Sequence, residues 1–328
     1  MRVLITGVTG FVGSHMADYL VAEHPNVEIA GMKRWRSPKD NIRHLLDRIT
    51  CYDCDLRDLS SLITTLTKIK PDIIFHLAAQ SYVSTSYVAP VDTIETNVVG
   101  TVNLLEAVRF AKINPVIHVC SSSEVYGQVD KKDVPIREDC PLRPVSPYAV
   151  SKVGEDMTAY MYHKAYGLKT IRSRMFTHSG PRRGEVFVDS WCALQLAWIE
   201  HDMQGPVLRV GNLDSVRTFC DVRDTVKAYW LLATKCPPGE VYNIGGSTTM
   251  TIREMLDMLL EMTTHKGRIE VQVDPTLLRP ADVTLQIPCI DKFKAVTGWE
   301  PTISYSQTLR DMLDYWRDEV RRELPQRA

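Results

Sequence analysis

The sequence predicts an α/β protein in which a doubly wound parallel sheet carries a smaller, interleaved C-terminal lobe. Short apolar strands alternate with helices from the first residue to about residue 175, which is typical of βα units and of a sheet covered on both faces. The first strand runs into a glycine-rich turn that opens a helix, as in Rossmann-type sheets. Beyond residue 165 the alternation loosens. We expect residues 1–172 to form the first domain, with elements at about 210–245 returning to it, and residues 173–328 to form mainly the smaller lobe.

The composition indicates a globular chain without the excess of positive charge that would attract a polyanionic partner. The 328 residues are 44% hydrophobic, and 39 basic against 40 acidic residues leave a net charge of −1. This balance gives no reason to expect nucleic acid or an anionic membrane, and no apolar run approaches the ~20 residues of a membrane span. Eight scattered cysteines suit a reducing cytoplasm. Cys51 and Cys54 are a close pair without a second pair at zinc spacing, so we expect no metal site.

A strand at Met1–Thr6, a glycine-rich turn and a helix over Met16–Val21 predict a dinucleotide site. The spacing G-x-x-G-x-x-G lets the backbone approach a pyrophosphate, which a helix N-terminus stabilises. The spacing is a weak signal alone, and its place between a strand and a helix carries the prediction. The expected cofactor contacts in this turn are Gly7, Thr9, Gly10, Phe11, Val12 and Gly13.

The residues after the second strand, Val27–Gly31, predict which dinucleotide binds. Binders of NAD usually place an acidic residue there, against the ribose 2′-hydroxyl. This chain has Lys33, Arg34 and Arg36 instead, and cations suit the 2′-phosphate of NADP because Arg can make a bidentate contact. A solvated basic loop is the alternative. We expect NADP.

Three further strands are expected to end at the same edge of the sheet, where ligands bind in open α/β folds. They are Ile49–Cys54, Ile73–Gln80 and Val116–Cys120, and a helix over 97–111 precedes the last of them. Small residues at the end of the second would let the cofactor lie close. The expected cofactor contacts at these strand ends are Asp55, Leu56, Leu77, Ala78 and Ala79.

A cluster of two hydroxyls and a carboxylate, Ser122, Ser123 and Glu124, precedes a Tyr-x-x-x-Lys pair, Tyr148 and Lys152. Residues at i and i+4 share one face of a helix. The ammonium can favour the tyrosinate and lower the pKa of the phenol from its reference value near 10, which makes Tyr a usable base. An exposed helical pair is the alternative. Together these side chains predict hydride transfer with further proton transfers.

The C-terminal half has less regular spacing between its elements. It ends in an amphipathic helix and contains a strand that finishes in two glycines. The expected elements are strands at 170–175, 205–210 and 241–246 and helices at 148–165, 189–201, 222–233, 250–262 and 306–322.

Further motifs accompany these segments: His76-Leu77-Ala78-Ala79, Asn97, Ser146-Pro147-Tyr148 and Gly180-Pro181-Arg182-Arg183-Gly184. With them, essentially the whole chain resembles the extended short-chain dehydrogenase/reductases that act on nucleotide sugars. Within that superfamily it is most similar to the GDP-mannose 4,6-dehydratases and the related GDP-4-keto-6-deoxy-mannose reductases. The dehydratase-like segments are 32–34, 122–124 and 181–187. The reductase-like segments are 211–217, 221–224 and 241–244, and both groups share Leu278-Arg279-Pro280.

The resemblance implies a role for each catalytic candidate. Tyr148 would remove the sugar O4 proton while the C4 hydride passes to the nicotinamide; Lys152 would tune Tyr148 and hold the cofactor ribose, and Ser122 would bind O4. Glu124 would take the C5 proton and protonate the departing 6-hydroxyl, with Ser123 assisting, before hydride returns to C6. The oxidised cofactor is regenerated, so tight NADP binding is implied. The dehydratases usually carry Thr at position 122, and Ser keeps the hydroxyl.

The resemblance also implies a GDP-sugar substrate and a homodimer or homotetramer built on helices 95–111 and 148–165. Arg217 and Arg279 are candidates for the diphosphate because Arg offers forked donors, with surface salt bridges as the alternative. The expected substrate contacts are Ser81, Ser122, Glu124, Tyr148, Thr177, Val188, Arg217, Asn243 and Arg279. The remaining expected cofactor contacts are Tyr148, Lys152, His178 and Arg183.

Several alternatives stay open at the level of sequence. Some keto-sugar reductases also carry Glu at position 124, so an NADPH-dependent reductase, with Tyr148 acting as acid, or an epimerase is the alternative activity. A cofactor-sensing regulatory protein on the same fold is a further one. Arg182 and Arg183 would bind substrate or reach the cofactor of a neighbouring subunit. His76 and His178 are expected to be structural rather than catalytic, and GDP-mannose is not distinguished from a GDP-manno-heptose.

Overall fold

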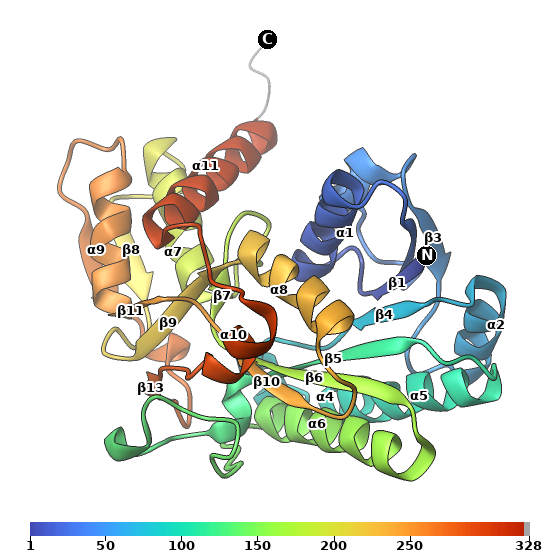
Figure 1. The fold of residues 1–328 in the computed structure, drawn as a ribbon. Coiled ribbons are helices and arrows are strands. Elements are labelled where there is room, and N and C mark those ends of the chain that lie inside the picture. Colours follow the sequence, from blue (N-terminus) through green and yellow to red (C-terminus); the bar gives the residue numbers. More distant parts are fainter. Residues whose placement is uncertain (325–328) are drawn as a thin grey trace.

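The computed structural model describes residues 1–324 and places a seven-stranded parallel sheet at the centre of the molecule (Figure 1). Its strand order is β3-β2-β1-β4-β5-β6-β10, so the order reverses between β1 and β4. This confirms the predicted doubly wound sheet. The strands are β1 (Arg2–Thr6), β2 (Glu28–Lys33), β3 (Thr50–Asp53), β4 (Ile73–His76), β5 (Val116–Ser122), β6 (Lys169–Met175) and β10 (Val241–Ile244).

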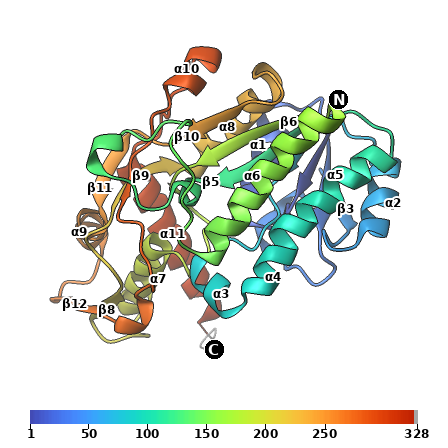
Figure 2. The ribbon, with the colours of Figure 1, turned by 90° about the horizontal axis from the view of Figure 1, so that it is seen from below.

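Helices cover both faces of this sheet (Figures 1 and 2). Val3 and Ile5 of β1 pack with α1 (Phe11–Glu23) and α8 (Val222–Lys235) on one face, whereas Leu4 belongs to the core on the other. Both faces of β1 are therefore apolar, as expected for a strand in a parallel sheet covered on both sides. The helices of the second face are α2 (Leu59–Ile69), α5 (Gly100–Phe110) and α6 (Pro147–Tyr166).

A smaller lobe packs beside the carboxyl edge of the sheet (Figure 1). Leu196, Phe219, Met255 and Leu309 are buried in its core. The strands of the lobe are β7 (His178–Ser179), β8 (Val207–Val210), β9 (Val216–Asp221), β11 (Thr248–Thr251), β12 (Glu270–Val273) and β13 (Leu285–Gln286). Its helices are α7 (Val188–Glu200), α9 (Ile252–Met262) and α11 (Tyr305–Glu323).

The chain crosses between the two regions more than once. Strand β10 pairs with β6 of the central sheet, and α10 (Asp291–Thr297) places Phe293 in the same core as Tyr242. Within residues 1–324, no helix is long and apolar enough to cross a membrane. The shorter helices are α3 (Val83–Val88), α4 (Pro90–Ile94) and 3-10 turns at Asp40–Leu45, Ser123–Tyr126, Lys131–Asp133 and Pro275–Leu277.

Several elements differ from those expected. The strand predicted to continue to Gln80 ends at His76, because the next two backbone N–H groups donate to the Thr6 side chain. The first residues of the helix predicted over 97–111 belong to a π-helical turn, Glu95–Val99, which follows α4, and the α-helix itself begins at Gly100. Strand β9 and the two-residue strands have no clear period in the sequence. The helix predicted from Met250 begins at Ile252, because Thr251 caps it.

A buried ion cluster joins α6 to β6. Asp156 accepts hydrogen bonds from Arg172 Nη1 at 2.9 Å and from Arg174 Nε at 2.8 Å, and all three side chains are almost completely enclosed. Arg174 also donates to the Tyr126 hydroxyl and to the Glu138 carbonyl oxygen. One carboxylate thus offsets two buried cations and holds the chain that follows β5 against the sheet.

Replacing Asp156 by Asn should destabilise the protein strongly. Two buried guanidinium groups lose their anion, and leaving such a charge uncompensated costs about 3–5 kcal/mol. Urea unfolding measures the change in free energy. Asp318→Asn is the matched control, because Asp318 forms an exposed pair with Arg321 and should cost less than about 1 kcal/mol. Equal losses in the two variants would contradict the role given to Asp156.

Candidate active site

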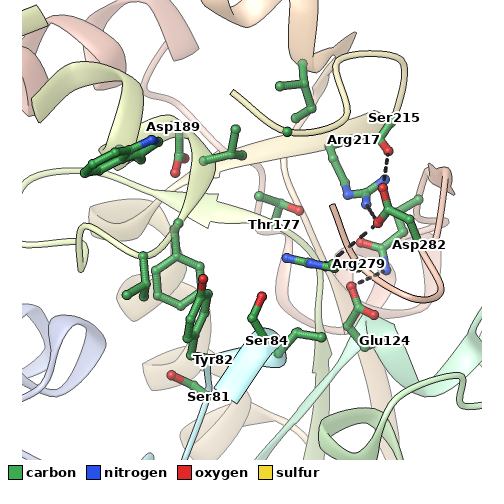
Figure 3. A pocket seen from close by; sticks show the side chains of 18 of the residues that line it. Ser81, Tyr82, Ser84, Glu124, Thr177, Asp189, Ser215, Arg217, Arg279 and Asp282 are labelled. Atoms are coloured by element: carbon green, nitrogen blue, oxygen red, sulfur yellow. Dashed lines mark hydrogen bonds and ion pairs between the residues drawn. The ribbon is translucent and has the colours of Figure 1, made fainter. Parts of the chain in front are cut away.

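A cavity of about 420 Å³ opens where the carboxyl edge of the sheet meets the smaller lobe. Figure 3 shows Arg217, Arg279 and Asp282 on one side of it and Asp189 on the other. The cavity brings together residues far apart in the sequence, including all the predicted substrate contacts except one. Those that line it are Ser81, Ser122, Glu124, Tyr148, Thr177, Val188, Arg217 and Arg279, and Ser123 lines it as well.

Asn243 lies apart from the cavity, contrary to its predicted contact with substrate. Its side chain is fully buried. The amide group donates to the Ile136 carbonyl oxygen at 2.9 Å, and the amide oxygen accepts from the Tyr126 hydroxyl at 2.7 Å. Its polar atoms therefore tie β10 to the segment after β5, where a substrate has no access.

The predicted catalytic residues Ser122, Ser123 and Glu124 lie at the end of β5 and in the 3-10 turn that follows. Ser122 Oγ accepts a hydrogen bond from the Glu124 N–H at 3.2 Å, which sets the start of the turn. Ser123 Oγ donates to Gln286 Oε1 at 3.1 Å, and Gln286 Nε2 donates to Glu124 Oε1 at 3.3 Å. Gln286 of β13 thus fixes both side chains. Gln286 was not predicted, because a strand of only two residues leaves no periodic pattern in the sequence.

The cap of α6 places Tyr148 at the floor of the cavity. Ser146 Oγ accepts from the Ala149 N–H at 3.0 Å, and Pro147 occupies the first turn. Burial raises the pKa of Tyr148 to about 12, while Lys152 and Ser122 act in the opposite direction. The Lys152 ammonium lies 5.9 Å from the Tyr148 ring centroid. The predicted pair therefore shares one helix face, and its cation is the group that favours tyrosinate.

The turn between β1 and α1 has the shape of a phosphate cradle. Gly7 has φ +70°, and a Cβ there would lie 2.9 Å from the Ala78 Cα. A Cβ on Gly13 would lie 2.2 Å from the Gly7 carbonyl oxygen. Helix α1 has no side-chain cap, so the N–H groups of its first turn remain available to an anion. The residues present fit a dinucleotide pyrophosphate.

The three cations predicted to bind a 2′-phosphate differ in their surroundings. Lys33 is buried and forms an ion pair with Asp53 of β3, so its charge is already offset. Arg34 and Arg36 are exposed, and the Arg36 guanidinium lies 4.5 Å from the centroid of the Trp35 ring. Of these three cations, the two arginines form no ion pair within the described residues and could donate to a phosphate. The prediction for Lys33 overlooked a cross-strand carboxylate, which the sequence does not reveal.

The predicted cofactor contacts Asp55 and Leu56 lie at the start of the loop after β3. Asp55 accepts hydrogen bonds from the backbone and side chain of Arg57. Leu56 is buried, and its Cβ would lie 2.9 Å from a Cβ built on Gly100 of α5. Leu56 therefore contributes packing and backbone to this loop, whereas the Asp55 carboxylate is at the surface.

The loop after β6 forms the rim between the cofactor turn and the cavity. The His178 ring stacks on Phe11 with centroids 5.8 Å apart, and burial lowers the pKa of His178 to about 4. Arg183 forms an ion pair with Asp189 at 3.0 Å and lies 4.4 Å above the Phe187 ring. His178 and Arg183 both line the cavity, so they are in reach of a ligand shared between the turn and the cavity.

Arg182 has a different place from Arg183. Its guanidinium pairs with Asp18 at 2.5 Å, bonds His15 Nδ1 at 2.9 Å and donates to the Asn41 carbonyl oxygen at 3.0 Å. Burial and Arg182 lower the pKa of His15 to about 4, so its ring accepts this bond as a neutral group. Arg182 thus holds the loop against α1, and unlike Arg183 it is not among the residues that line the cavity.

The polar side of the cavity has a carboxylate between two arginines (Figure 3). Asp282 Oδ1 lies 3.6 Å from Arg217 and 3.9 Å from Arg279. Its other oxygen accepts from Asn212 at 2.8 Å and from Ser215 at 3.0 Å. Asp282 was not singled out in the sequence, although it follows Arg279 by three residues. It holds both guanidinium groups at the cavity wall.

Comparison with known proteins identifies the relatives of this fold and site. The sequence model of the family described as GDP-mannose 4,6 dehydratase matches residues 4–312. A GDP-6-deoxy-D-mannose reductase from Pseudomonas aeruginosa is 31% identical over 98% of this chain and 99% of its own length. A GDP-mannose 4,6-dehydratase from Yersinia enterocolitica is 31% identical over 95% of this chain and 92% of its own length.

Solved structures with similar sequences share the fold over nearly the whole chain. The Pseudomonas aeruginosa protein RMD, complexed with NADPH, has 30% identity and a TM-score of 0.83, covering 97% of this chain and 99% of its own. The UDP-glucose 4-epimerase of Thermus thermophilus, in complex with NAD, has 29% identity and a TM-score of 0.84 over 97% of this chain and 99% of its own. This chain belongs to the GDP-mannose 4,6-dehydratase family of enzymes.

Proposed function

We propose that this protein is an NADP-dependent nucleotide-sugar 4,6-dehydratase that acts on GDP-mannose or a GDP-manno-heptose. The observation that carries the proposal is that Glu124 and Tyr148 line one cavity, together with Ser122. Two proton-transfer groups of different chemistry are what a dehydration coupled to oxidation needs. A simple reduction of a ketone needs only one of them.

Tyr148 and Ser122 would act at sugar C4. When bound, the nicotinamide would accept a hydride from C4 and return it to C6. Ser122 Oγ holds the O4 hydroxyl, and the Tyr148 oxygen takes its proton, with the Lys152 ammonium offsetting the negative charge of the phenolate. The position of Lys152 on the same helix face supports this division of work.

Glu124 and Ser123 would act at C5 and C6. A C4 ketone acidifies the C5 hydrogen, which the Glu124 carboxylate can take as a proton and then give to the departing 6-hydroxyl. Its bond to Gln286 Nε2 uses Oε1, which leaves Oε2 for proton transfer. Ser123 is bound to the same glutamine, so both groups keep a fixed separation through the reaction.

The nucleotide would lie along the smaller lobe. Arg217 and Arg279 provide guanidinium donors for a diphosphate, and Asp282 keeps them oriented. Burial lowers the pKa of Arg217, while Glu124 and Asp282 raise it. A buried cation with incomplete compensation favours an anionic ligand beside it.

An NADPH-dependent reductase acting on a GDP-4-keto-6-deoxy sugar is the second candidate. The observation that favours it is the alignment with the Pseudomonas aeruginosa reductase, which spans 99% of that protein. In this reading Tyr148 donates a proton to the C4 oxygen, and Glu124 has no proton to take from C5. Because some keto-sugar reductases also carry Glu at this position, the requirement for added NADPH is what separates the two candidates.

A reducing compartment and self-association belong to the same proposal. All eight cysteines are free thiols, which suits the cytoplasm. Exposed apolar side chains gather on α4, on the π-helical turn and on α6, which pack against one another. We propose this surface as a homodimer interface, since contiguous apolar exposure marks association sites. Its members are Val91, Val99, Val150, Met157 and Met161.

Purified protein should convert GDP-mannose or the GDP-manno-heptose to a 4-keto-6-deoxy product without added NADPH, because the hydride taken from C4 returns to C6. Mass spectrometry would show the loss of 18 mass units expected for water. A strict need for stoichiometric NADPH, with a keto-sugar as substrate, would establish the reductase instead.

Two variants separate the steps of this reaction. Tyr148→Phe should lose turnover by about 10²–10⁴-fold, the range for a general base, while NADP binding persists. Glu124→Gln should still reduce bound NADP with substrate, seen as absorbance at 340 nm, but release almost no product. Normal turnover in Glu124→Gln would show that the carboxylate takes no proton in the slow steps.

Removal of the two exposed arginines should change cofactor preference. In Arg34→Ala/Arg36→Ala the affinity for NADP should fall by about tenfold or more, because hydrogen bonds to charged groups contribute about 1.5–3 kcal/mol. Affinity for NAD should stay nearly constant. Calorimetric titration measures both, and Arg43→Ala, an exposed cation paired with Asp40, is the control. A parallel loss for both cofactors would refute the 2′-phosphate assignment.

A charge placed in the apolar surface should separate the subunits. Met157→Glu would bury an unpaired carboxylate in the interface, which is costly, so sedimentation should show a monomer where the parent protein is a dimer. Val273→Glu changes an exposed apolar residue on β12 of the smaller lobe and should leave the mass unchanged. A parent protein that sediments as a monomer would contradict this assignment.

A further inference from the structure

Glu155 is a buried carboxylate to which the proposed reaction gives no role. It follows Tyr148 by seven residues and Lys152 by three, so the three side chains lie along one stripe of α6. Lys152 Nζ donates to Glu155 Oε2 at 3.0 Å and to the Cys120 carbonyl oxygen at 3.0 Å. Only 6% of the Lys152 side chain and 2% of the Glu155 side chain are exposed.

The other titratable groups around this ion pair are neutral. Burial lowers the pKa values of His76 on β4 and His118 on β5 to about 3. Burial also raises the pKa of the Cys120 thiol on β5 and that of the Tyr229 phenol on α8. None of these four carries charge at neutral pH, so none screens the pair.

The nearby charged groups are already matched to one another. Asp156, next to Glu155 on α6, is held between Arg172 and Arg174 of β6. Lys152 is therefore the cation that faces Glu155, and Glu155 is the anion that faces Lys152. In the reaction, however, the same ammonium must also face the tyrosinate.

The two anions compete for one cation. Lys152 lowers the pKa of Tyr148 and Glu155 raises it, against a larger effect of burial. Burial raises the pKa of Glu155, and its ion pair with Lys152 opposes this. The other carboxylate oxygen, Oε1, has no hydrogen-bond partner in the described part of the chain, so it can take a proton while Oε2 keeps its bond to Lys152.

We propose that Glu155 is a positioning residue: its carboxylate anchors the Lys152 ammonium beneath Tyr148 and cancels part of its charge, and thereby sets how readily Tyr148 releases its proton. This rests on the proposed function, in which Tyr148 is the base at O4. A phenol that takes the O4 proton must give it up again before the next turnover. A tyrosinate stabilised by the full charge of Lys152 would be a weak base, and Glu155 moderates that charge.

The pH dependence of kcat/KM should therefore change when the Glu155 charge is removed. In Glu155→Gln the Tyr148 pKa falls, so the acid limb should move to lower pH, by about one pH unit, the lower end for a neighbouring charge. Glu155→Asp keeps the charge and should keep the limb near its parent position. If Glu155 only fills space, Glu155→Asp should shift the acid limb more than Glu155→Gln, because Gln preserves the shape of Glu whereas Asp leaves a gap.

A second readout does not require turnover. Tyrosinate absorbs at 295 nm, and Tyr148 is isolated by subtracting the titration of the same protein with Tyr148→Phe, in complex with oxidised NADP. The Tyr148 step should lie at lower pH in Glu155→Gln. Glu155→Met, which also lacks the charge, serves if the Gln variant does not fold. Glu106→Gln removes a carboxylate of α5 that pairs with Arg109 and accepts from the Tyr162 hydroxyl; it should leave the Tyr148 step unchanged once the Tyr148→Phe titration in the same background is subtracted.

The outcomes distinguish this proposal from the one on which it rests. Parent-level turnover in Tyr148→Phe would overturn the proposed function itself. Suppose instead that Tyr148→Phe loses turnover but the Tyr148 titration is unchanged in folded variants that lack the charge at position 155. The proposed function would then stand, and the role of Glu155 would be overturned.

Discussion

A chain of buried hydrogen bonds through His76 connects the cofactor turn to the catalytic helix. Thr6 Oγ1 bonds His76 Nδ1 at 3.0 Å, and His76 Nε2 bonds Thr101 at 3.0 Å. Thr101 donates to the Asn97 carbonyl oxygen, and the Asn97 amide group donates to Ser151 at 2.8 Å. A neutral ring, whose pKa burial lowers to about 3, is what lets one histidine donate on one side and accept on the other. The sheet, α5 and α6 are fixed relative to one another by this chain.

The same contacts separate the strands at the edge of the sheet where ligands bind in open α/β folds. Because Thr6 also accepts from the N–H groups of Leu77 and Ala78, β4 ends early and the chain separates from β1 at the point where strand order reverses. Ala78 then lies against Gly7, where a side chain would not fit. One set of contacts thus determines where β4 ends and how the glycine turn and α6 are placed relative to each other.

Local patterns predicted the part of the site that lies within single βα units. The glycine turn, the end of β5 and the Tyr148–Lys152 pair depend on neighbours within a few residues, so their positions follow from period and spacing. Lys33 and Arg182 were treated as free cations because the carboxylates that pair with them, Asp53 and Asp18, come from other elements. Asn243 was misplaced for the same reason, since its partners lie on a different segment.

The site residues that come from the smaller lobe could not be predicted from the sequence. Asp282 reaches the cavity from a loop, and Gln286 from the two-residue strand β13, about 160 residues after Glu124. No periodic pattern in the sequence indicates where either residue lies. Yet Gln286 restrains Glu124, and Asp282 holds the arginines opposite. In the proposed mechanism the larger lobe supplies Tyr148 and Lys152 for the proton transfer at O4, whereas Glu124, proposed for the second proton transfer, is held by Gln286 of the smaller lobe. If Glu124 has the proposed role, the capacity for dehydration depends on this contact between the two lobes and not on the Tyr-x-x-x-Lys pair alone.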